Sequence, residues 1–407
     1  MIFTSKTKII VEEAKIDEFL TRSVEKVYPS ADFLKKTLLL GKQLSFYFGI
    51  DPTGPSIHIG HVIPLLALAR LQKLGHKVTL LIGDFTAMIG DPDKLSTREP
   101  LSKKQVLANL KDYKKQASRI IDFHGANKAN IVFNSKWLSK MNFEDVLSLA
   151  SKMTLQQMIE RDLFDKRIKE GRPVYLHEFM YPLMQGYDSV SLQTDGEIGG
   201  NDQTFNMLTG RNLEKEILGK EKFVLTTKLL TDSSGKKMGK SEGNMVALLD
   251  KPSDVFGKIM SWGDGSIVPA LEYCTTLPMS EIEKTKDNLA KGLNPRDEKK
   301  KLAYAITELC FGPKDAQYAM EIFEKTFQKK EILDDVPEIV AAAGDDIGAL
   351  LIEKGFVSSK TELRRLASFG AITEVGKNKK ITQEEISTIK DGTYKIGKHR
   401  FVKIIIK

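Results

Sequence analysis

Asp51-Pro52-Thr53-Gly54-Pro55-Ser56-Ile57-His58-Ile59-Gly60-His61 is the stretch that decides the fold of this chain. It lies between a strand-like run, residues 43–50, and an apolar helical run that ends at Gly75. A strand, a turn of small residues and a helix form the first half of a βαβ unit. Such a turn points backbone N–H groups and the positive end of the helix at one place above the sheet, which suits an anion.

Two histidines fall at the expected start of this helix. Pro64 restricts that start, because proline is tolerated in the first turn of a helix. The helix is therefore predicted to begin between His58 and His61, where each imidazole can donate an N–H to a phosphate oxygen. The pair could also be ordinary polar residues at a helix start, or metal ligands. Metal is the poorest of these readings, because no third ligand of suitable spacing lies nearby.

Composition favours a soluble cytoplasmic protein. The 407 residues include 62 basic and 54 acidic side chains, a net charge of +8, which fits a polyanionic partner without requiring one. Cys274 and Cys310 are the only cysteines, so a reducing compartment is the default. No apolar run approaches the ~18 residues of a membrane span, and no signal-peptide pattern opens the chain. We therefore predict no membrane contact.

The remaining pattern alternates strands and helices, as in an α/β protein with a parallel sheet. Lys77 to Phe85 is a short apolar run closed by Gly83-Asp84, which predicts a second parallel strand. Further strands are expected over 130–133 and 223–230. Helices are expected over 62–74, 103–122, 143–169, 178–192 and 252–330, and residues 1–42 also look helical.

The end of the chain is more basic than the rest. A boundary is expected near 334–345, which is rich in Asp, Gly, Pro and Ala. From Asp346 onward there are 13 basic and 7 acidic residues, so most of the net charge lies here. The basic side chains fall on one side of a short helix and in a following turn: Lys360, Arg364, Arg365, Lys377, Lys379 and Lys380. Such a surface is suited to nucleic-acid phosphates.

Three polar side chains share one face of the predicted helix over 178–192. Tyr181, Gln185 and Asp188 follow the spacing i, i+4, i+7. They could form an ordinary amphipathic face, but apolar residues already surround them, so polar groups that face the sheet need partners. Tyr47 and Asp91 could converge with them above the carboxyl ends of the strands, where open parallel sheets bind ligands.

A second charged motif, Gly235-Lys236-Lys237-Met238-Gly239-Lys240-Ser241, lies in a polar loop. It nearly matches a P-loop, but Ser234 stands where the first glycine is required. A solvated loop is one reading and a nucleotide kinase is another. Lysines on a glycine hinge can also close on a polyphosphate and leave again.

Together these residues resemble the tyrosyl-tRNA synthetases, a family of class I aminoacyl-tRNA synthetases. The "HIGH" signature is intact at residues 58–61, and "KMSKS" stands at 237–241 with Gly239 in place of the first serine. Tyr47 precedes Gly-Ile-Asp-Pro-Thr, Asp91 lies in Ile-Gly-Asp-Pro, and Gln203 ends Gly-Gly-Asn-Asp-Gln. The tail from about Asp346 resembles an S4 RNA-binding domain, and this match is looser because the family's "VNG"-like turn stands here only as Val375-Gly376-Lys377-Asn378.

The resemblance implies a Rossmann-like parallel-sheet catalytic domain over 1–250, with an inserted helical dimerisation segment at about 100–190. An α-helical domain over 251–333 and a small α+β S4-like domain over 346–407 would follow. It also implies a homodimer, with L-tyrosine, ATP accompanied by Mg²⁺, and tRNA(Tyr) as partners, and no tightly bound cofactor or protein metal site.

The implied reaction joins tyrosine and ATP into tyrosyl-adenylate and then moves the tyrosyl group to tRNA. Catalysis would fall to His58, His61, Lys237 and Lys240. The implied ATP-binding residues are Asp51, Thr53, His58, Gly60, His61, Lys237, Lys240 and Ser241. The implied tyrosine-binding residues are Tyr47, Asp91, Tyr181, Gln185, Asp188 and Gln203.

Three other identities stay open at this point. A tryptophanyl enzyme is the nearest, although an indole N–H only donates, whereas Tyr47 with Asp188 offers both a donor and an acceptor. A P-loop nucleotide kinase and a non-catalytic RNA-binding protein on a synthetase scaffold are the others.

Overall fold

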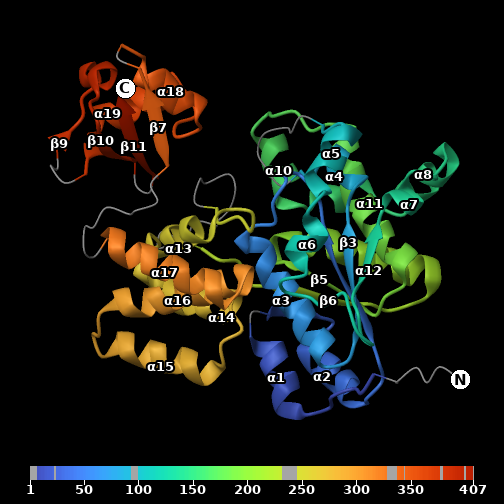
Figure 1. Cartoon of the computed structure of the whole chain (residues 1–407). Coiled ribbons are helices and arrows are strands. Elements are labelled where there is room, and N and C mark those ends of the chain that lie inside the picture. Colours follow the sequence, from blue (N-terminus) through green and yellow to red (C-terminus); the bar gives the residue numbers. More distant parts are fainter. Residues whose placement is uncertain are drawn as a thin grey trace, which may run out of the picture. The chain divides into compact units, whose positions relative to one another are not determined.

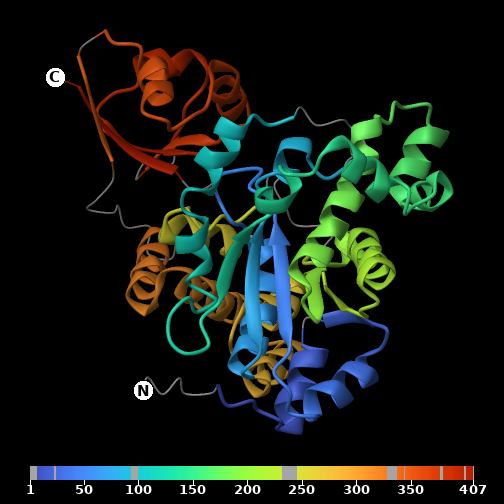
Figure 2. The same cartoon turned by 90° about the vertical axis from the view of Figure 1, so that its right-hand side faces the viewer.

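A computed structural model describes residues 7–22, 24–92, 100–231, 245–327, 337–342, 344–375, 379–397 and 400–406. The chain divides into two compact units, one formed by 1–250 with 261–312 and the other by 251–260 with 313–407. No helix within the described residues is long and apolar enough to cross a bilayer. The sheet of the first unit and the helices on both its faces can be followed in Figures 1 and 2.

The first unit alternates strands and helices, as the sequence predicts. Its strands are β1 (Val24–Tyr28), β2 (Ser45–Ile50), β3 (Lys77–Ile82), β4 (Asn130–Phe133), β5 (Gly196–Gly200) and β6 (Phe223–Thr227). Its helices are α1 (Glu13–Thr21), α2 (Ala31–Leu39), α3 (Ile59–Lys73), α4 (Thr86–Ile89), α5 (Lys103–Leu110), α6 (Tyr113–Ala117), α7 (Ser135–Leu138), α8 (Phe143–Ala150), α9 (Leu155–Ile159), α10 (Asp162–Lys169), α11 (Leu176–Leu192), α12 (Thr204–Leu218), α14 (Ile267–Cys274), α15 (Met279–Ala290) and α16 (Pro295–Phe311).

The six strands form one sheet in the order β1-β6-β5-β2-β3-β4. The pairs from β6 to β4 are parallel, which confirms the predicted parallel sheet. β1 pairs antiparallel with β6 and adds an edge strand. The prediction of a wholly helical segment before residue 42 is therefore wrong at β1. A short mixed-charge edge strand lacks the apolar run of a buried parallel strand, so its pairing partner decides its conformation.

The start of α3 agrees with the prediction, but for a different reason. His58 is the N-cap residue and Ile59 is the first helical residue. Pro64 lies in the second turn, so proline does not set the start as the sequence argument assumed. The start is fixed by capping hydrogen bonds of His58, described below. α3 is buried on nearly every side, as expected of a helix packed between a sheet and other helices.

Residues 261–312 belong with the first unit, although the sequence suggested one helical domain over 251–333. A buried contact explains the grouping. Arg22 follows α1, and its guanidinium Nη2 donates to the carbonyl of Thr275, just past α14, at 2.9 Å. Its Nε donates to the carbonyl of Glu272 at 3.0 Å. These partners are about 250 positions apart in the chain, so no local pattern could reveal them.

The second unit contains helices α13 (Pro252–Met260) and α17 (Pro313–Phe327) and a five-stranded sheet. The tail contains β7 (Glu338–Ala341), α18 (Ile347–Glu353), α19 (Lys360–Ser368), β8 (Ile372–Glu374), β9 (Lys379–Lys380), β10 (Gly392–Ile396) and β11 (Arg400–Ile406). β7 lies within the predicted boundary segment 334–345 and pairs parallel with β11, so the tail sheet begins before residue 346, where the S4-like domain was predicted to start. An apolar core that includes Ile339, Leu351 and Val402 supports it.

A buried carboxylate on α12 makes stability depend on pH. Glu214 is fully buried, and its oxygens have no hydrogen-bond partner among the described residues, although Lys220 Nζ lies 3.8 Å away. Burial raises the Glu214 pKa to about 7. The folded state thus keeps a proton that the unfolded state releases at lower pH. The stability that this proton provides is complete below the unfolded pKa and is lost as pH rises through about 7.

We therefore expect Glu214→Gln to be about as stable as the wild type at pH 4.5 and about 1–3 kcal/mol more stable at pH 8.5. Chemical denaturation at both pH values measures the difference. Glu216→Gln is the matched control, because Glu216 lies exposed on the same helix. Equal shifts for both variants at the two pH values would contradict the assignment.

Candidate active site

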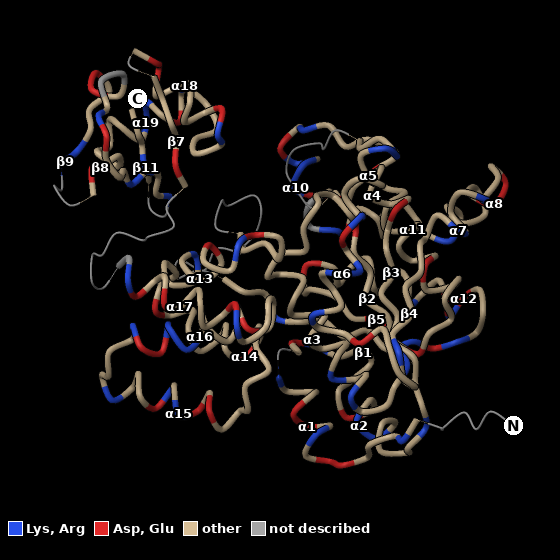
Figure 3. The backbone as a smooth tube through the Cα atoms, viewed as in Figure 1, with Lys and Arg blue, Asp and Glu red and all other residues tan. Residues whose placement is uncertain are grey.

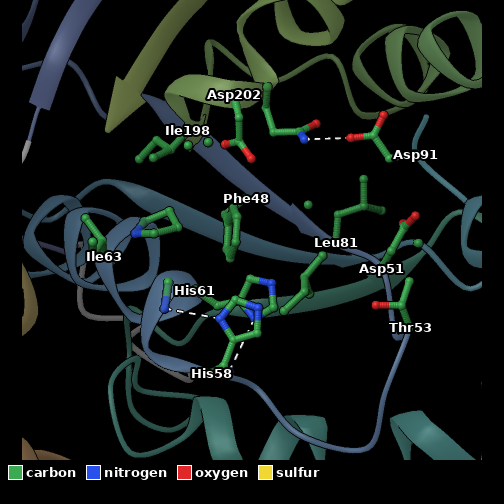
Figure 4. A pocket seen from close by; sticks show the side chains of 18 of the residues that line it. Phe48, Asp51, Thr53, His58, His61, Ile63, Leu81, Asp91, Ile198 and Asp202 are labelled. Carbon is green, nitrogen blue, oxygen red and sulfur yellow. Dashed lines mark hydrogen bonds between the residues drawn. The ribbon is translucent and has the colours of Figure 1, made fainter. Parts of the chain in front are cut away.

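A pocket of about 630 Å³ opens above the carboxyl ends of β2, β3 and β5. This is where the sequence predicted a ligand site. Figure 4 shows the two imidazoles on one side of the pocket and Asp91 on the opposite side. The predicted site residues that line it are Tyr47, Asp51, Thr53, His58, Gly60, His61, Asp91, Tyr181, Gln185, Asp188 and Gln203.

Side chains from α5 and α6 hold the turn that precedes α3. Asn109 Nδ2 donates to the carbonyl of Pro52 at 2.9 Å, and the Tyr113 hydroxyl donates to the carbonyl of Gly54 at 2.7 Å. Gln116 Oε1 accepts from the backbone N–H of Ile57 at 2.8 Å. The sequence predicted only charged helices here and did not reveal these supports. They fix a proline- and glycine-containing loop that makes few backbone hydrogen bonds of its own.

The two histidines cap α3 and stack on one another. His58 Nδ1 accepts from the backbone N–H of Gly60 at 3.2 Å, and His61 Nδ1 lies 3.4 Å from the backbone nitrogen of His58. The ring centroids are 3.7 Å apart, and Figure 4 shows the stacked pair. Because both Nδ1 atoms accept, the neutral rings carry their protons on Nε2. Each Nε2–H can act as a donor at the positive end of α3.

Asp51, at the end of β2, links the turn to α11. Its carboxylate accepts from the hydroxyl of Tyr181 at 2.9 Å and from the hydroxyl of Thr86 at 2.7 Å. A Cβ at Gly83 would lie 1.9 Å from Asp51 Oδ1, so only glycine leaves room for this carboxylate. Burial and the nearby Asp51 and Asp91 carboxylates raise the Tyr181 pKa well above its ordinary value. Tyr181 therefore stays a neutral hydroxyl donor.

Asp91 follows α4 and joins two distant elements. Its carboxylate accepts from Gln203 Nε2 at 2.8 Å and from Arg161 Nη2 at 2.7 Å. Asp91 and Gln203 were both predicted from the sequence to lie at the tyrosine site, whereas Arg161 was not predicted. Arg161 lies 70 positions away in a charged helical stretch, where an arginine is ordinarily solvated. The guanidinium partly neutralises this side of the pocket.

Asp188 is 2% exposed and lies deep in the pocket. It accepts from Trp137 Nε1 at 2.8 Å and from Asn134 Nδ2 at 3.2 Å, both at the start of α7. Burial raises the Asp188 pKa well above its ordinary value, and these two N–H donors oppose that rise by stabilising the carboxylate. Asn134 and Trp137 were not predicted, because their role depends on β4 lying beside β3.

Several predicted residues lie outside the described part of the chain: Lys237, Gly239, Lys240, Ser241 and Lys377. The residues on either side of the lysine loop are described. Leu229, Leu230 and Met245 all line the pocket, and the backbone N–H of Ile59 donates to the carbonyl of Val246 at 2.9 Å. The residues that follow the loop thus adjoin the histidine end of the site, and Leu229, which precedes the loop, lies beside Gly200 at the end of β5. In the tail, Lys360, Arg364 and Arg365 are exposed on α19, and Lys379 and Lys380 are exposed on β9. Figure 3 marks the basic positions along the backbone in blue.

The fold is that of the class I tRNA synthetases. A family model described as "tRNA synthetases class I (W and Y)" matches residues 40–328. The structure is similar to that of a C-terminally truncated mitochondrial tyrosyl-tRNA synthetase of Aspergillus nidulans, with a TM-score of 0.67 at 25% sequence identity. The similar region covers 77% of this chain and 94% of the Aspergillus nidulans chain.

Close relatives specify the amino acid. A tyrosine–tRNA ligase of Carboxydothermus hydrogenoformans is 43% identical, over 96% of this chain and 97% of its own length. A tyrosine–tRNA ligase of Thermotoga maritima is 41% identical, over 97% of each chain. The chain therefore belongs to the tyrosine–tRNA ligase family. The family resemblance inferred from the two signatures is confirmed, and the tryptophanyl and kinase readings are set aside.

Proposed function

We propose that this chain activates L-tyrosine with ATP and transfers the tyrosyl group to the 3′-terminal ribose of tRNA(Tyr). One observation carries the proposal. A single pocket joins two imidazoles at a helix N-terminus to a buried tyrosine–aspartate pair. The first group suits phosphates and the second suits a phenol. Tyrosine, ATP and tRNA are also the partners that the family membership implies.

Activation needs no side-chain nucleophile. The tyrosine carboxylate attacks the α-phosphate of ATP, the bond between that phosphorus and the bridging oxygen breaks, and pyrophosphate leaves. Catalysis then rests on placement and on stabilising charge. His58 and His61 donate from the mouth of α3, and Lys237 and Lys240 meet the pyrophosphate charge from the adjoining loop. Asp51, Thr53, Gly60 and Ser241 complete the nucleotide site.

Mg²⁺ would arrive with the ATP phosphates and supply charge neutralisation there. The described residues contain no cluster of three or more acidic, histidine or cysteine side chains arranged to hold a metal ion. Mg²⁺ that accompanies a nucleotide is usually bound by one or two carboxylates together with substrate phosphates and water. The chain's own contribution is the set of N–H and ammonium donors.

The other end of the pocket recognises tyrosine. Tyr47 and Asp188 contact the phenol, and Asp91, Tyr181 and Gln185 hold the ammonium group. Gln203 supports this set, because it donates to Asp91 and accepts from Asn206 Nδ2 at 3.1 Å. Phenylalanine offers no hydroxyl to the buried Tyr47 and Asp188, so each of them would lack the additional hydrogen bond that tyrosine makes, and the site rejects it.

Tyrosine-dependent exchange of labelled pyrophosphate into ATP tests the proposal. We expect exchange with tyrosine and little with phenylalanine or tryptophan, and we expect AMP as the nucleotide product once tRNA is added. ADP formation would instead indicate a kinase. Absence of exchange with every amino acid would contradict the activation step.

The tail is proposed to bind tRNA. Its exposed basic residues on α19 and β9 suit phosphates, and unpaired bases would supply identity, because the A-form major groove is closed to side chains. A chain that ends at residue 327 is expected to keep pyrophosphate exchange within about twofold, whereas tRNA charging falls by at least about tenfold at 0.15 M salt. Raising salt should weaken charging by the full chain more than exchange. Full charging by the short chain would contradict the role.

Exposed apolar side chains support a homodimer through the helices between the two halves of the sheet. Phe143, Leu155 and Leu176 are 77%, 60% and 84% exposed. These residues lie on α8, on α9 and at the start of α11, and exposed apolar side chains that gather on one part of a fold are typical of a protein interface. A cytoplasmic location accords with the buried free thiols of Cys274 and Cys310.

A further inference from the structure

A buried ion pair lies directly behind the phenol end of the pocket. Lys222 Nζ is 2.5 Å from Glu197 Oε2, and both side chains are almost completely buried. Lys222 also donates to the hydroxyl of Ser189 on α11, and that hydroxyl lies 2.8 Å from the hydroxyl of Tyr47. Lys222 is thus joined through one serine to a residue that reads the substrate.

The fold leaves space for this group of side chains. Gly210 on α12 faces it, and a Cβ at this position would lie 2.6 Å from Ser189 Oγ and 3.0 Å from Lys222 Nζ. Burying two charges gains little stability, because their desolvation offsets most of their attraction, and an apolar pair of similar size is often as stable. A role in recognition is therefore a better explanation for this pair than a role in stability.

The donors and acceptors available on Lys222, Ser189 and Tyr47 determine the direction of the hydrogen bonds between them. An ammonium only donates, so Lys222 occupies one lone pair of Ser189 Oγ. The single Ser189 proton can reach Tyr47 at 2.8 Å or Glu197 Oε2 at 3.5 Å. O–H···O bonds are 2.5–3.0 Å long, so Tyr47 is the better acceptor. Tyr47 then keeps its own proton, and a bound phenol competes for this proton with the Glu197 carboxylate, which also faces the Tyr47 hydroxyl.

We propose that Lys222 is a specificity-determining positioning residue that sets the direction of the hydrogen bond between Ser189 and Tyr47. Lys222 donates to Ser189, Ser189 to Tyr47, Tyr47 to the substrate phenol, and the phenol to Asp188. This series of hydrogen bonds begins at an ammonium, which can only donate, and ends at a carboxylate, which accepts. Phenylalanine has no hydroxyl, so it breaks the series between Tyr47 and Asp188. This inference rests on the proposed function, in which Tyr47 and Asp188 recognise the phenol.

The test compares kcat/KM for tyrosine and phenylalanine in pyrophosphate exchange. Without the ammonium, Ser189 can accept from Tyr47, which turns the Tyr47 proton away from the substrate. We expect Lys222→Met to lower the tyrosine-to-phenylalanine ratio by about tenfold, the size expected for one hydrogen bond. The loss should fall on tyrosine, with phenylalanine changed by less than about twofold. Lys220→Met is the matched control, because Lys220 lies two positions before Lys222 but pairs with Asp195 instead of Ser189.

A second substitution separates direction from packing. In Lys222→Met with Ser189→Ala, the competing acceptor is gone, so Tyr47 can again donate to the phenol. We expect part of the ratio to return. If Lys222 only fills space, the added truncation should lower activity toward both amino acids further. That result, or an unchanged ratio in folded Lys222→Met, would overturn the inference.

Two further variants, Lys222→Gln and Tyr47→Phe, distinguish loss of folding and loss of phenol recognition from the role proposed for Lys222. If Lys222→Met does not fold, Lys222→Gln carries the test, because its amide can pair with Glu197 while its oxygen accepts from Ser189. The ratio is expected to fall for this variant also, and an unchanged ratio would refute the inference. Tyr47→Phe is measured in parallel. If the tyrosine-to-phenylalanine ratio falls in Tyr47→Phe but not in the Lys222 variants, the role of Lys222 is refuted and the proposed function stands. If the ratio is unchanged in all of these variants, the proposal that Tyr47 recognises the phenol is itself refuted.

Discussion

Asp188→Ala is expected to lose most of the discrimination between tyrosine and phenylalanine. The substitution removes the buried acceptor proposed for the phenol proton, and it leaves the N–H groups of Trp137 and Asn134 without their partner. Loss of a hydrogen bond to a charged group costs about 1.5–3 kcal/mol, or roughly 10- to 100-fold in kcat/KM for tyrosine. Phenylalanine makes no such bond, so its kcat/KM should change far less.

Pyrophosphate exchange with each amino acid measures the two constants. Asp287→Ala, at an exposed position on α15, is the matched control and should leave the ratio unchanged. Thermal unfolding of the Asp188 variant should show a loss of about 1–3 kcal/mol, from the two unpaired buried donors. Equal losses for tyrosine and phenylalanine would show that Asp188 supports the pocket without reading the phenol.

His58→Ala is expected to slow adenylate formation by roughly 10²- to 10³-fold. That range is typical when one donor to a developing negative charge is removed from an enclosed site. The effect should fall on kcat, because the charge on the leaving pyrophosphate grows only as the bond breaks. Single-turnover formation of the adenylate at saturating ATP measures it. His124→Ala, at an exposed histidine, is the control.

The capping role of His58 must be separated from its catalytic role. Because His58 accepts from the N–H of Gly60, alanine also removes a cap worth about 1 kcal/mol. Asparagine is among the best N-cap residues, so His58→Asn should restore the thermal stability. Its shorter side chain does not carry a donor to the position of Nε2, so the slow rate should remain. If His58→Asn forms the adenylate at the wild-type rate, His58 serves only as a helix cap and does not contribute to catalysis.

The short patterns of this sequence identify much of the site. The strand–turn–helix pattern at 43–75 places His58 and His61 at a helix start, and the structure has α3 begin there. The i, i+4, i+7 spacing places Tyr181, Gln185 and Asp188 on one face, and all three line the pocket. Such predictions succeed because helical period and strand direction are local properties, and parallel strands bring their carboxyl ends to one edge.

The tertiary structure alone decides which side chains support that site. The ion pair of Arg161 with Asp91 joins positions 70 apart, and the bond of Trp137 to Asp188 joins positions 51 apart. Lys222 reads in the sequence as a surface lysine before a strand, yet it is almost fully buried behind Tyr47. A charged residue is buried only where folding supplies a partner for it, and that partner is not encoded in the local sequence. The sequence thus determined which predicted groups line the pocket, and packing determined the charges and hydrogen bonds that hold them in place.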